Sequence, residues 1–140
     1  MKSRRFVLFA LFVVSTISFA AVAFKAPPSS YQLLIFEGSD WCRICIKLEQ
    51  TILSNDAFIN FSKEQQIELI RLDFPQRISL DQKTQDYNAS MAEKYNFDGS
   101  FPTLLLVNET SEVVEKITYR NESLSDFLGI MVNTLEAYEK

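Results

Sequence analysis

The fold is decided by Trp41-Cys42-Arg43-Ile44-Cys45, a stretch that contains both cysteines of the 140-residue chain. A thiol in the first turn of a helix lies beside free backbone N–H groups and the positive end of the helix dipole, and both stabilise its thiolate. The sequence therefore predicts Cys42 as the attacking sulfur. Cys45 follows one helical turn later, where its thiol can displace a mixed disulfide and leave an internal bond. We expect Cys45 to be the resolving sulfur.

Two cysteines at this spacing also occur in metal sites and in structural disulfides. A structural zinc ion normally takes four protein ligands, and the chain has no histidine and no second cysteine pair, so a zinc site would need a dimer. No metal is therefore predicted. A structural disulfide would close a loop of only four residues, which removes little entropy from the unfolded chain.

Residues 1–23 have the order of segments that is typical of a secretory signal peptide. Three of the first five residues are basic, an apolar run begins at Phe6, and Ala-Val-Ala occupies positions 21–23. We expect cleavage after Ala23. The alternative is an uncleaved membrane anchor, because residues 6–24 are long enough to span a bilayer. In both cases the domain is expected outside the cytoplasm, where a vicinal cysteine pair persists as a disulfide or is cycled by partners.

Composition and charge indicate one acidic globular domain. Hydrophobic residues make up 47% and aromatic residues 13% of the chain, which is enough for one core. Without the three basic residues of 1–23, the count of Lys and Arg falls from 14 to 11 against 18 acidic residues. Such a chain is not expected to bind nucleic acid. The acids are dispersed along the sequence, which favours solubility over a functional acidic face.

The hydrophobic pattern predicts an α/β domain. Residues 24–30 contain Pro27-Pro28 and form a stiff linker. A helix capped by Ser39 or Asp40 is expected from the cysteine pair to about 53, and residues 76–85 are expected to be a loop. Further helices are expected at 56–62, 89–95 and 124–135, the last capped by Ser123, and strands at 33–36, 67–73, 103–107 and 113–118. We expect the strand at 67–73 to be an inner strand.

The sequence resembles the thioredoxin superfamily. The resemblance rests on Trp41-Cys42-x-x-Cys45 after a strand and on Phe101-Pro102-Thr103 before the next one, and it covers about residues 31–138. The sequence of residues 36–42, together with Asp73-Phe74-Pro75 downstream, is similar to the sequences of exported bacterial thioredoxin-like proteins. It is also similar to that of the periplasmic module of thiol:disulfide interchange proteins. The resemblance implies a three-layer α/β/α sandwich with a central mixed sheet over residues 31–140. It also implies a location in the bacterial periplasm.

The same resemblance implies roles for five residues. Cys42 is the nucleophile, Cys45 the resolving cysteine, and Pro102 the proline that follows a cis peptide bond. The backbone of Phe101 then pairs with an extended substrate segment, and Trp41 offers the partner a flat apolar surface. The alternatives are a trans proline at the start of an edge strand for Pro102 and ordinary core packing for Trp41.

Three further residues are candidates for tuning the redox centre. Arg43 either places a cation beside the Cys42 thiolate or faces a partner protein. Ile44 adds no hydrogen-bond donor to the thiolate. The buried aspartate that accepts a proton in cytoplasmic thioredoxins falls at Phe36 here, so that relay is missing. Glu37, one position later, either takes over this role or is a solvated charge at a strand end.

Together these features predict a thiol-disulfide oxidoreductase of the cell envelope that exchanges disulfides with protein substrates. No cofactor is expected. We expect a monomer that works with a membrane-bound or soluble redox partner. The absence of histidine separates the motif from Cys-Gly-His-Cys isomerase centres, which favours reductase or general exchange activity over oxidase activity. The alternative is a redox-inactive binding or chaperone module, because a fold alone does not establish activity.

Overall fold

The computed structural model describes residues 31–138. The expected signal peptide or anchor at 1–23 and the linker at 24–30 lie outside the described residues. Over residues 31–138, none of the helices combines the length and the apolar character that a membrane crossing requires.

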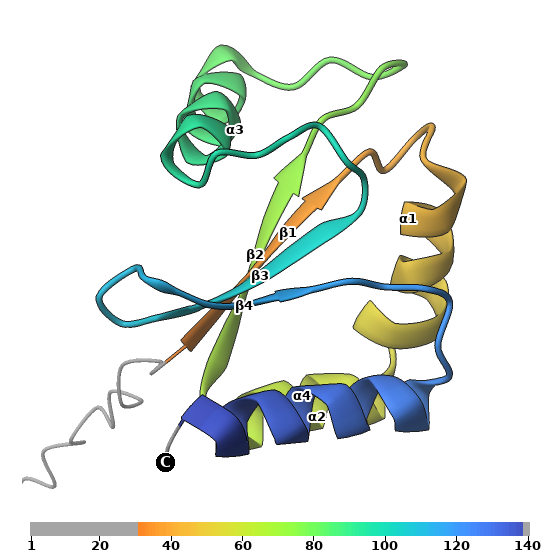
Figure 1. Ribbon diagram of the computed structural model, residues 1–140. Helices are drawn as coiled ribbons and strands as arrows, with labels where there is room; N and C mark the ends of the chain where they lie inside the picture. The colour runs from red at the N-terminus through yellow and green to blue at the C-terminus, as the bar shows by residue number, and fades with distance from the viewer. Residues whose placement is uncertain (1–30, 139–140) are drawn as a thin grey trace, which may run out of the picture.

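Within residues 31–138, four strands and five helical segments follow one another (Figure 1). Their order is β1 (Tyr31–Glu37), α1 (Arg43–Leu48), the π-helix η1 (Glu49–Leu53), α2 (Asp56–Glu64), β2 (Ile67–Asp73), α3 (Gln82–Lys94), β3 (Thr103–Asn108), β4 (Val113–Ile117) and α4 (Leu124–Tyr138). The sheet has the order β2-β1-β3-β4. β1 is parallel to β2 and antiparallel to β3, and β3 is antiparallel to β4. The predicted mixed sheet is confirmed.

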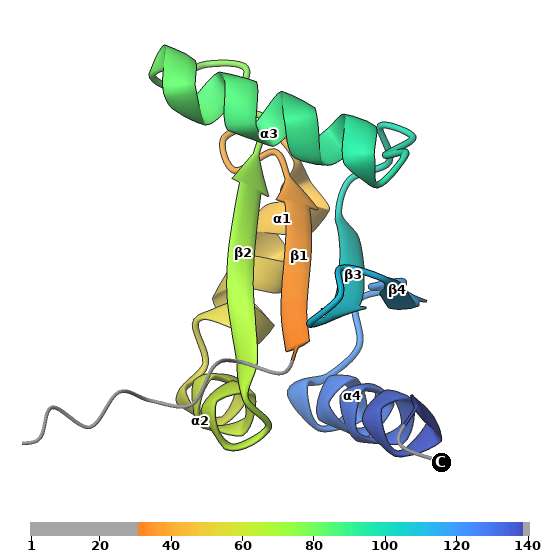
Figure 2. The same ribbon diagram turned by 90° about the vertical axis from the view of Figure 1, so that its left-hand side faces the viewer.

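The sheet lies between two layers of helices (Figure 2). Side chains alternate between the two faces along β1. Leu33 and Ile35 join the core formed with α1, η1, α2 and α4, whereas Leu34 and Phe36 join the core beneath α3. All four side chains are fully buried. The continuous apolar run of β1 is therefore explained by burial on both faces, and the three-layer sandwich is confirmed.

Two predictions about the elements were wrong. β2 is an edge strand rather than an inner one, because it pairs only with β1. The expected loop at 76–85 ends early, since α3 begins at Gln82. Asp81 caps this helix by accepting a hydrogen bond from the backbone N–H of Thr84 at 3.0 Å. The first turn of α3 is polar and solvent-exposed, so its sequence carried no apolar periodicity.

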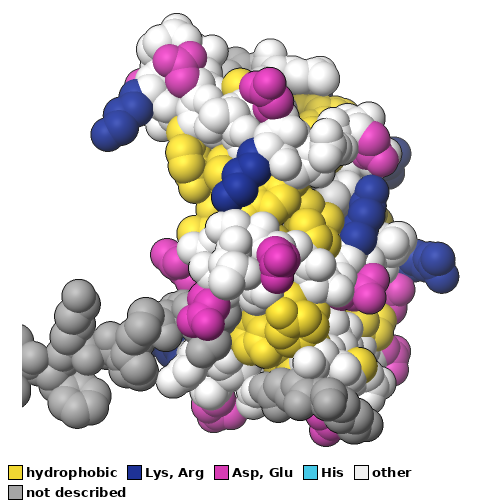
Figure 3. All heavy atoms as spheres, turned by 60° about the vertical axis from the view of Figure 1, so that its left-hand side comes forward, with side chains coloured by type: hydrophobic (Ala, Val, Ile, Leu, Met, Phe, Trp, Pro, Cys, Tyr) yellow, Lys and Arg dark blue, Asp and Glu magenta, His cyan; other side chains and the backbone are white. Residues whose placement is uncertain are grey.

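Charges on the surface are spread out, as the sequence indicated. On the face drawn in Figure 3, acidic side chains are scattered over the molecule, while apolar side chains gather in a band below α3. This distribution agrees with acidic residues that serve solubility.

Candidate active site

Cys42 and Cys45 lie directly after the turn that follows β1. Cys42, rather than Ser39 or Asp40, is the N-cap of α1, and its Sγ accepts a hydrogen bond from the backbone N–H of Cys45 at 3.2 Å. The two sulfurs form a disulfide, with an S–S distance of 2.07 Å. Cys42 is 5% exposed and Cys45 only 1%. Cys42 is therefore the more exposed of the two residues, and the N–H directed at its Sγ is a donor of the kind that stabilises a thiolate.

Trp41 is held in place on both sides of its indole ring. Its Nε1 donates a hydrogen bond to the carbonyl oxygen of Phe74 at 2.8 Å. Its ring meets Phe101 edge-on, with 5.2 Å between the ring centroids. The peptide bond between Phe101 and Pro102 is cis, and Pro102 directly precedes β3. The structure thus brings together Trp41 and Phe101, two of the three residues expected to contact substrate, with Pro102 next along the chain.

Phe101 rests on a cluster of aromatic rings that the sequence analysis did not single out. Phe97 lies 5.0 Å from Phe101 and 4.5 Å from the fully buried Phe36, measured between ring centroids. Phe74 lies 5.8 Å from Phe101. Such ring pairs add to the free energy gained from burial. The segment before β3 is therefore anchored to the core beneath α3.

Gly38 is required for this placement of Trp41. A Cβ atom at position 38 would overlap the Trp41 indole. We expect Gly38→Ala to displace the ring and to lower the free energy of unfolding by about 1–3 kcal/mol, the usual range for overpacking. Trp41 is the only tryptophan, so its fluorescence spectrum reports the displacement.

Gly129→Ala is the matched control, because a Cβ at that helical position meets nothing within 4 Å. It should leave the fluorescence unchanged and stabilise the protein by up to about 1 kcal/mol. Equal effects of the two substitutions would contradict the role of Gly38.

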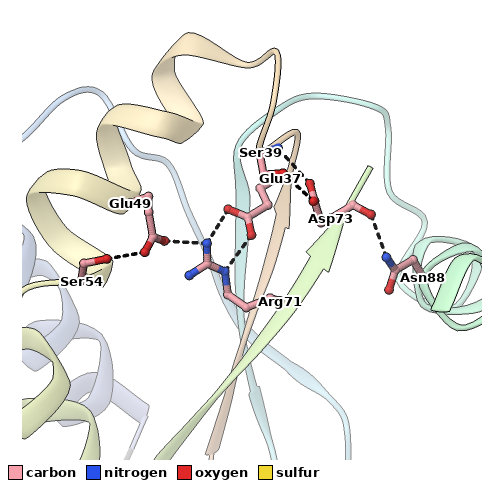
Figure 4. A network of polar contacts seen from close by, with 7 residues as sticks. All are labelled: Glu37, Ser39, Glu49, Ser54, Arg71, Asp73 and Asn88. Atoms are coloured by element: carbon pink, nitrogen blue, oxygen red, sulfur yellow. Dashed lines mark hydrogen bonds and ion pairs between the residues drawn. The ribbon is translucent and has the colours of Figure 1, made fainter. Parts of the chain in front are cut away.

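Glu37 is a buried ion-pair partner and not the solvated strand-end charge of the alternative interpretation. It is 3% exposed. Arg71 of β2 donates to both of its carboxylate oxygens, from Nε at 2.7 Å and from Nη2 at 2.8 Å. Nη2 also lies 2.5 Å from Oε2 of Glu49, which in turn accepts a hydrogen bond from Ser54 (Figure 4). One guanidinium therefore connects β1, β2 and η1.

This network shifts the pKa values of two of its members. Burial raises the pKa of Glu49, but the hydrogen bond from Ser54 and the contact with Arg71 lower it more, so the net pKa lies below the usual value. Burial lowers the pKa of Arg71, whereas hydrogen bonds to Glu37 and Glu49 raise it above its usual value. Both charges are thus stabilised at neutral pH.

The network also borders the second cysteine. Glu37, Glu49 and Arg71 line a cavity of about 120 Å³ together with Cys45. The remaining tuning candidates lie elsewhere. Arg43 is exposed and makes no ion pair with any residue in the described range. Ile44 packs against the core that β1 forms with α1, η1, α2 and α4. The roles of Arg71 and Glu49 could not be predicted from the sequence, because no local pattern marks side chains that meet across separate elements.

The turn before Cys42 is bound to the last residue of β2 and to the segment that follows this strand. Ser39 donates to the Asp73 carboxylate from its backbone N at 2.8 Å and from its Oγ at 2.6 Å. The carboxylate of Asp40 accepts hydrogen bonds from the backbone N–H groups of residues 76, 77 and 78, at 2.9, 2.6 and 2.9 Å. Desolvation raises the pKa of Asp40, but these three bonds bring it below its usual value. Ser39 or Asp40 was expected to cap the helix; instead, Ser39 binds the end of β2 and Asp40 binds the loop after it.

Within residues 31–138, no three or more Asp, Glu, Cys or His side chains are grouped so that they could hold a metal ion. The chain has no cysteine besides Cys42 and Cys45.

Comparison with known proteins gives a consistent result. No model of a known protein family matches the sequence. A Chlamydia pneumoniae protein named disulfide bond reductase DsbH is 28% identical over 86 residues, which cover 61% of this chain and 51% of that protein. The chain therefore spans about half the length of this curated relative.

Solved structures match over most of the described domain. A DsbH oxidoreductase superposes with a TM-score of 0.70 at 23% identity, covering 77% of this chain and 74% of the other. A Thermus thermophilus thioredoxin superposes with a TM-score of 0.52 at 15% identity, covering 76% and 74%. At such identities the structural likeness concerns the fold. The chain therefore has a thioredoxin-like fold, and over part of its length its sequence is similar to that of a bacterial disulfide bond reductase.

Proposed function

We propose that the chain is a thiol:disulfide oxidoreductase that exchanges disulfides with protein substrates through Cys42 and Cys45. The observation that carries the proposal is the disulfide between these residues at the start of a helix, with the N–H of Cys45 directed at Cys42 Sγ. The reductase direction is favoured because the curated relative is named a disulfide bond reductase.

The reaction begins from the reduced protein. The Cys42 thiolate attacks one sulfur of a client disulfide, forms a mixed disulfide and expels the other client sulfur as a thiolate, which takes up a proton. Cys45 then loses its proton and attacks Cys42 Sγ. The mixed disulfide breaks, the second client thiolate leaves, and the Cys42–Cys45 bond forms. The client gains two electrons and two protons, and an external dithiol donor must reduce the protein again.

Glu37 is the residue that we assign to the proton of Cys45. Its buried carboxylate and Cys45 line the same cavity, and a carboxylate in that position accepts a proton from a thiol that is about to attack. Arg71 holds both oxygens of this carboxylate and thereby orients it. Arg43, exposed beside the pair, places a positive charge near the Cys42 thiolate.

Client binding is assigned to the surface around Trp41. The indole and the Phe101 ring form one apolar contact surface, and the backbone of Phe101 pairs with an extended client segment as an added strand. Pro102 lacks a backbone N–H, so it leaves the pairing to Phe101. We further propose that the protein works in the bacterial periplasm as a monomer, with a membrane-bound or soluble redox partner. The signal-peptide pattern of residues 1–23 supports this location.

The test is the reduction of insulin disulfides by dithiothreitol, measured as the onset of turbidity. We expect the purified domain to accelerate the reaction in proportion to its concentration. In cell-envelope extracts, Cys45→Ser should accumulate mixed disulfides with client proteins, which mass spectrometry identifies. No acceleration of insulin reduction, together with client binding that survives thiol blocking, would instead favour a redox-inactive binding module.

A further inference from the structure

A cavity of about 470 Å³ lies outside the candidate active site, between the segment 74–80 and α3. This segment connects β2 to α3 (Figure 1). One part of the cavity wall is apolar and includes Ile78, Leu80 and Ala89. Ile78 is 56% exposed, and the hydrogen bond from its backbone N–H to Asp40 holds this residue at the cavity wall. The volume lies in the range of cavities that bind small ligands or single side chains.

The polar part of the wall carries negative charge without a matching cation. Asp73 and Asp86 both line the cavity, and no Lys or Arg does. Asp73 accepts its two hydrogen bonds from Ser39, and one oxygen of Asp86 accepts a hydrogen bond from the Gln82 side chain at 2.7 Å. Neither carboxylate forms an ion pair with a residue in the range 31–138. The cavity therefore favours a ligand with positive charge.

Asn88 provides independent evidence for a ligand that donates hydrogen bonds. Its side chain lines the cavity although the residue is only 3% exposed. Its Nδ2 donates to the carbonyl oxygen of Asp73 at 2.7 Å, which fixes the orientation of the amide (Figure 4). The Oδ1 atom is left as an acceptor without a partner among the described residues. This oxygen is not among the buried side-chain atoms that lack a hydrogen bond, so it is accessible from the cavity and can accept a hydrogen bond from a bound donor.

The cavity is mechanically connected to the redox centre. The Asp40 carboxylate holds the backbone of Ile78, Ser39 holds Asp73, and Trp41 donates to the carbonyl of Phe74. All three are in the turn that ends at Cys42. The wall of the cavity is therefore fixed to the turn that carries the attacking cysteine.

We propose that this cavity binds an arginine side chain of the protein client. The aliphatic part of arginine fits against Ile78 and Leu80, and its guanidinium supplies donors and charge for Asn88 Oδ1 and Asp86. A guanidinium suits several converging acceptors better than an ammonium group, because its five N–H donors have fixed directions. The inference rests on the proposed function and adds a client preference to it.

The test uses a peptide without cysteine, so that binding is measured independently of disulfide exchange. The probe is acetyl-Gly-Ser-Gly-Arg-Gly-Ser-Gly-amide, and the control replaces arginine with neutral citrulline of the same shape. Both are titrated into the ¹⁵N-labelled oxidised domain. We expect saturable shifts of the amides of Ile78, Leu80, Asn88 and Ala89 with the arginine peptide, and binding at least about five-fold weaker with citrulline.

Two substitutions on α3 form the matched pair for this experiment. Asp86→Asn removes a charge from the cavity wall and should weaken arginine binding about three- to five-fold. Glu93→Gln removes a charge from an exposed position of the same helix that does not line the cavity, and should leave binding unchanged. Ala89→Phe fills the space and should abolish the shifts while the domain stays folded.

Three results would overturn the inference: equal binding of the citrulline peptide, equal effects of Asp86→Asn and Glu93→Gln, or the absence of saturable shifts at the cavity. Insulin reduction is measured on the same samples. If the peptide binds and insulin is not reduced, the exchange activity is wrong and the cavity assignment stands. If insulin is reduced and the peptide does not bind, only the cavity assignment is wrong.

Discussion

Cys42→Ser is expected to reduce the rate of insulin reduction to that of dithiothreitol alone. Its hydroxyl is not an effective nucleophile toward a disulfide at neutral pH, so no mixed disulfide forms. Cys45→Ser should differ in kind, because it retains the attacking sulfur and stops at the mixed disulfide. The measurement is insulin turbidity for both variants, together with mass spectrometry of the trapped species. Unchanged turnover in Cys42→Ser would exclude this residue as the nucleophile.

The reduced wild-type protein is the appropriate reference for the stability of these variants. Closing a four-residue loop contributes about 2 kcal/mol to the free energy of unfolding in the chain-entropy description, and both variants lose this contribution.

Alkylation of the reduced protein across a pH series gives a second test. We expect Cys42 to react at a pH below the pKa of free cysteine, about 8.5, and Cys45 to react slowly throughout. Two thiols that both titrate as in an unstructured peptide would contradict the assignment.

Arg71→Met is expected to lower the free energy of unfolding by about 3 kcal/mol, the lower end of the range for removing one partner of a buried ion pair. The lower end applies because the Arg71 side chain is 40% exposed, whereas that of Glu37 is 5% exposed. Without Arg71, Glu37 is a buried carboxylate that has lost both of its guanidinium donors. Urea unfolding at pH 7 measures the effect.

Lys116→Met is the matched control for this experiment. This substitution breaks the ion pair between Lys116 and Asp98, whose side chains are 52% and 56% exposed, respectively. It should lower the free energy of unfolding by less than about 1 kcal/mol. The double variant Glu37→Met, Arg71→Met removes both charges of the pair, the buried carboxylate included, and should recover most of the lost stability. A loss in Arg71→Met no larger than that in Lys116→Met would show that Glu37 does not depend on the guanidinium.

The same network predicts how stability changes in acid. The pKa of Glu49 is lower in the folded protein than the usual value of a glutamate, about 4.5, because Ser54 and Arg71 stabilise the carboxylate. Its contribution to stability is therefore complete above that value and is lost as the pH falls through the lower folded pKa. Arg71→Met removes one of the two interactions that lower this pKa. The decline in stability below about pH 4.5 should therefore be shallower in the variant.

Local sequence signals predicted most of the secondary structure because they act within a few residues. The apolar run of β1, the helical spacing of α4 and its cap Ser123, which accepts a hydrogen bond from the backbone N–H of Asp126, were all readable in sequence. The cysteine spacing predicted the pair that forms the disulfide. The polar start of α3 was missed, because an exposed helix turn has no apolar face to reveal it.

What the sequence determined by itself is therefore the order of elements, the buried central strand and the cysteine pair at the start of a helix. The tertiary structure alone decided that β2 lies at the edge, that Arg71 reaches both Glu37 and Glu49, and that Asp40 binds the backbone of residues 76–78. The physical reason is the separation along the sequence of the groups that interact. Periodicity and caps depend on neighbours within one or two turns, whereas these contacts join groups 22 to 38 positions apart and exist only after the strands have paired.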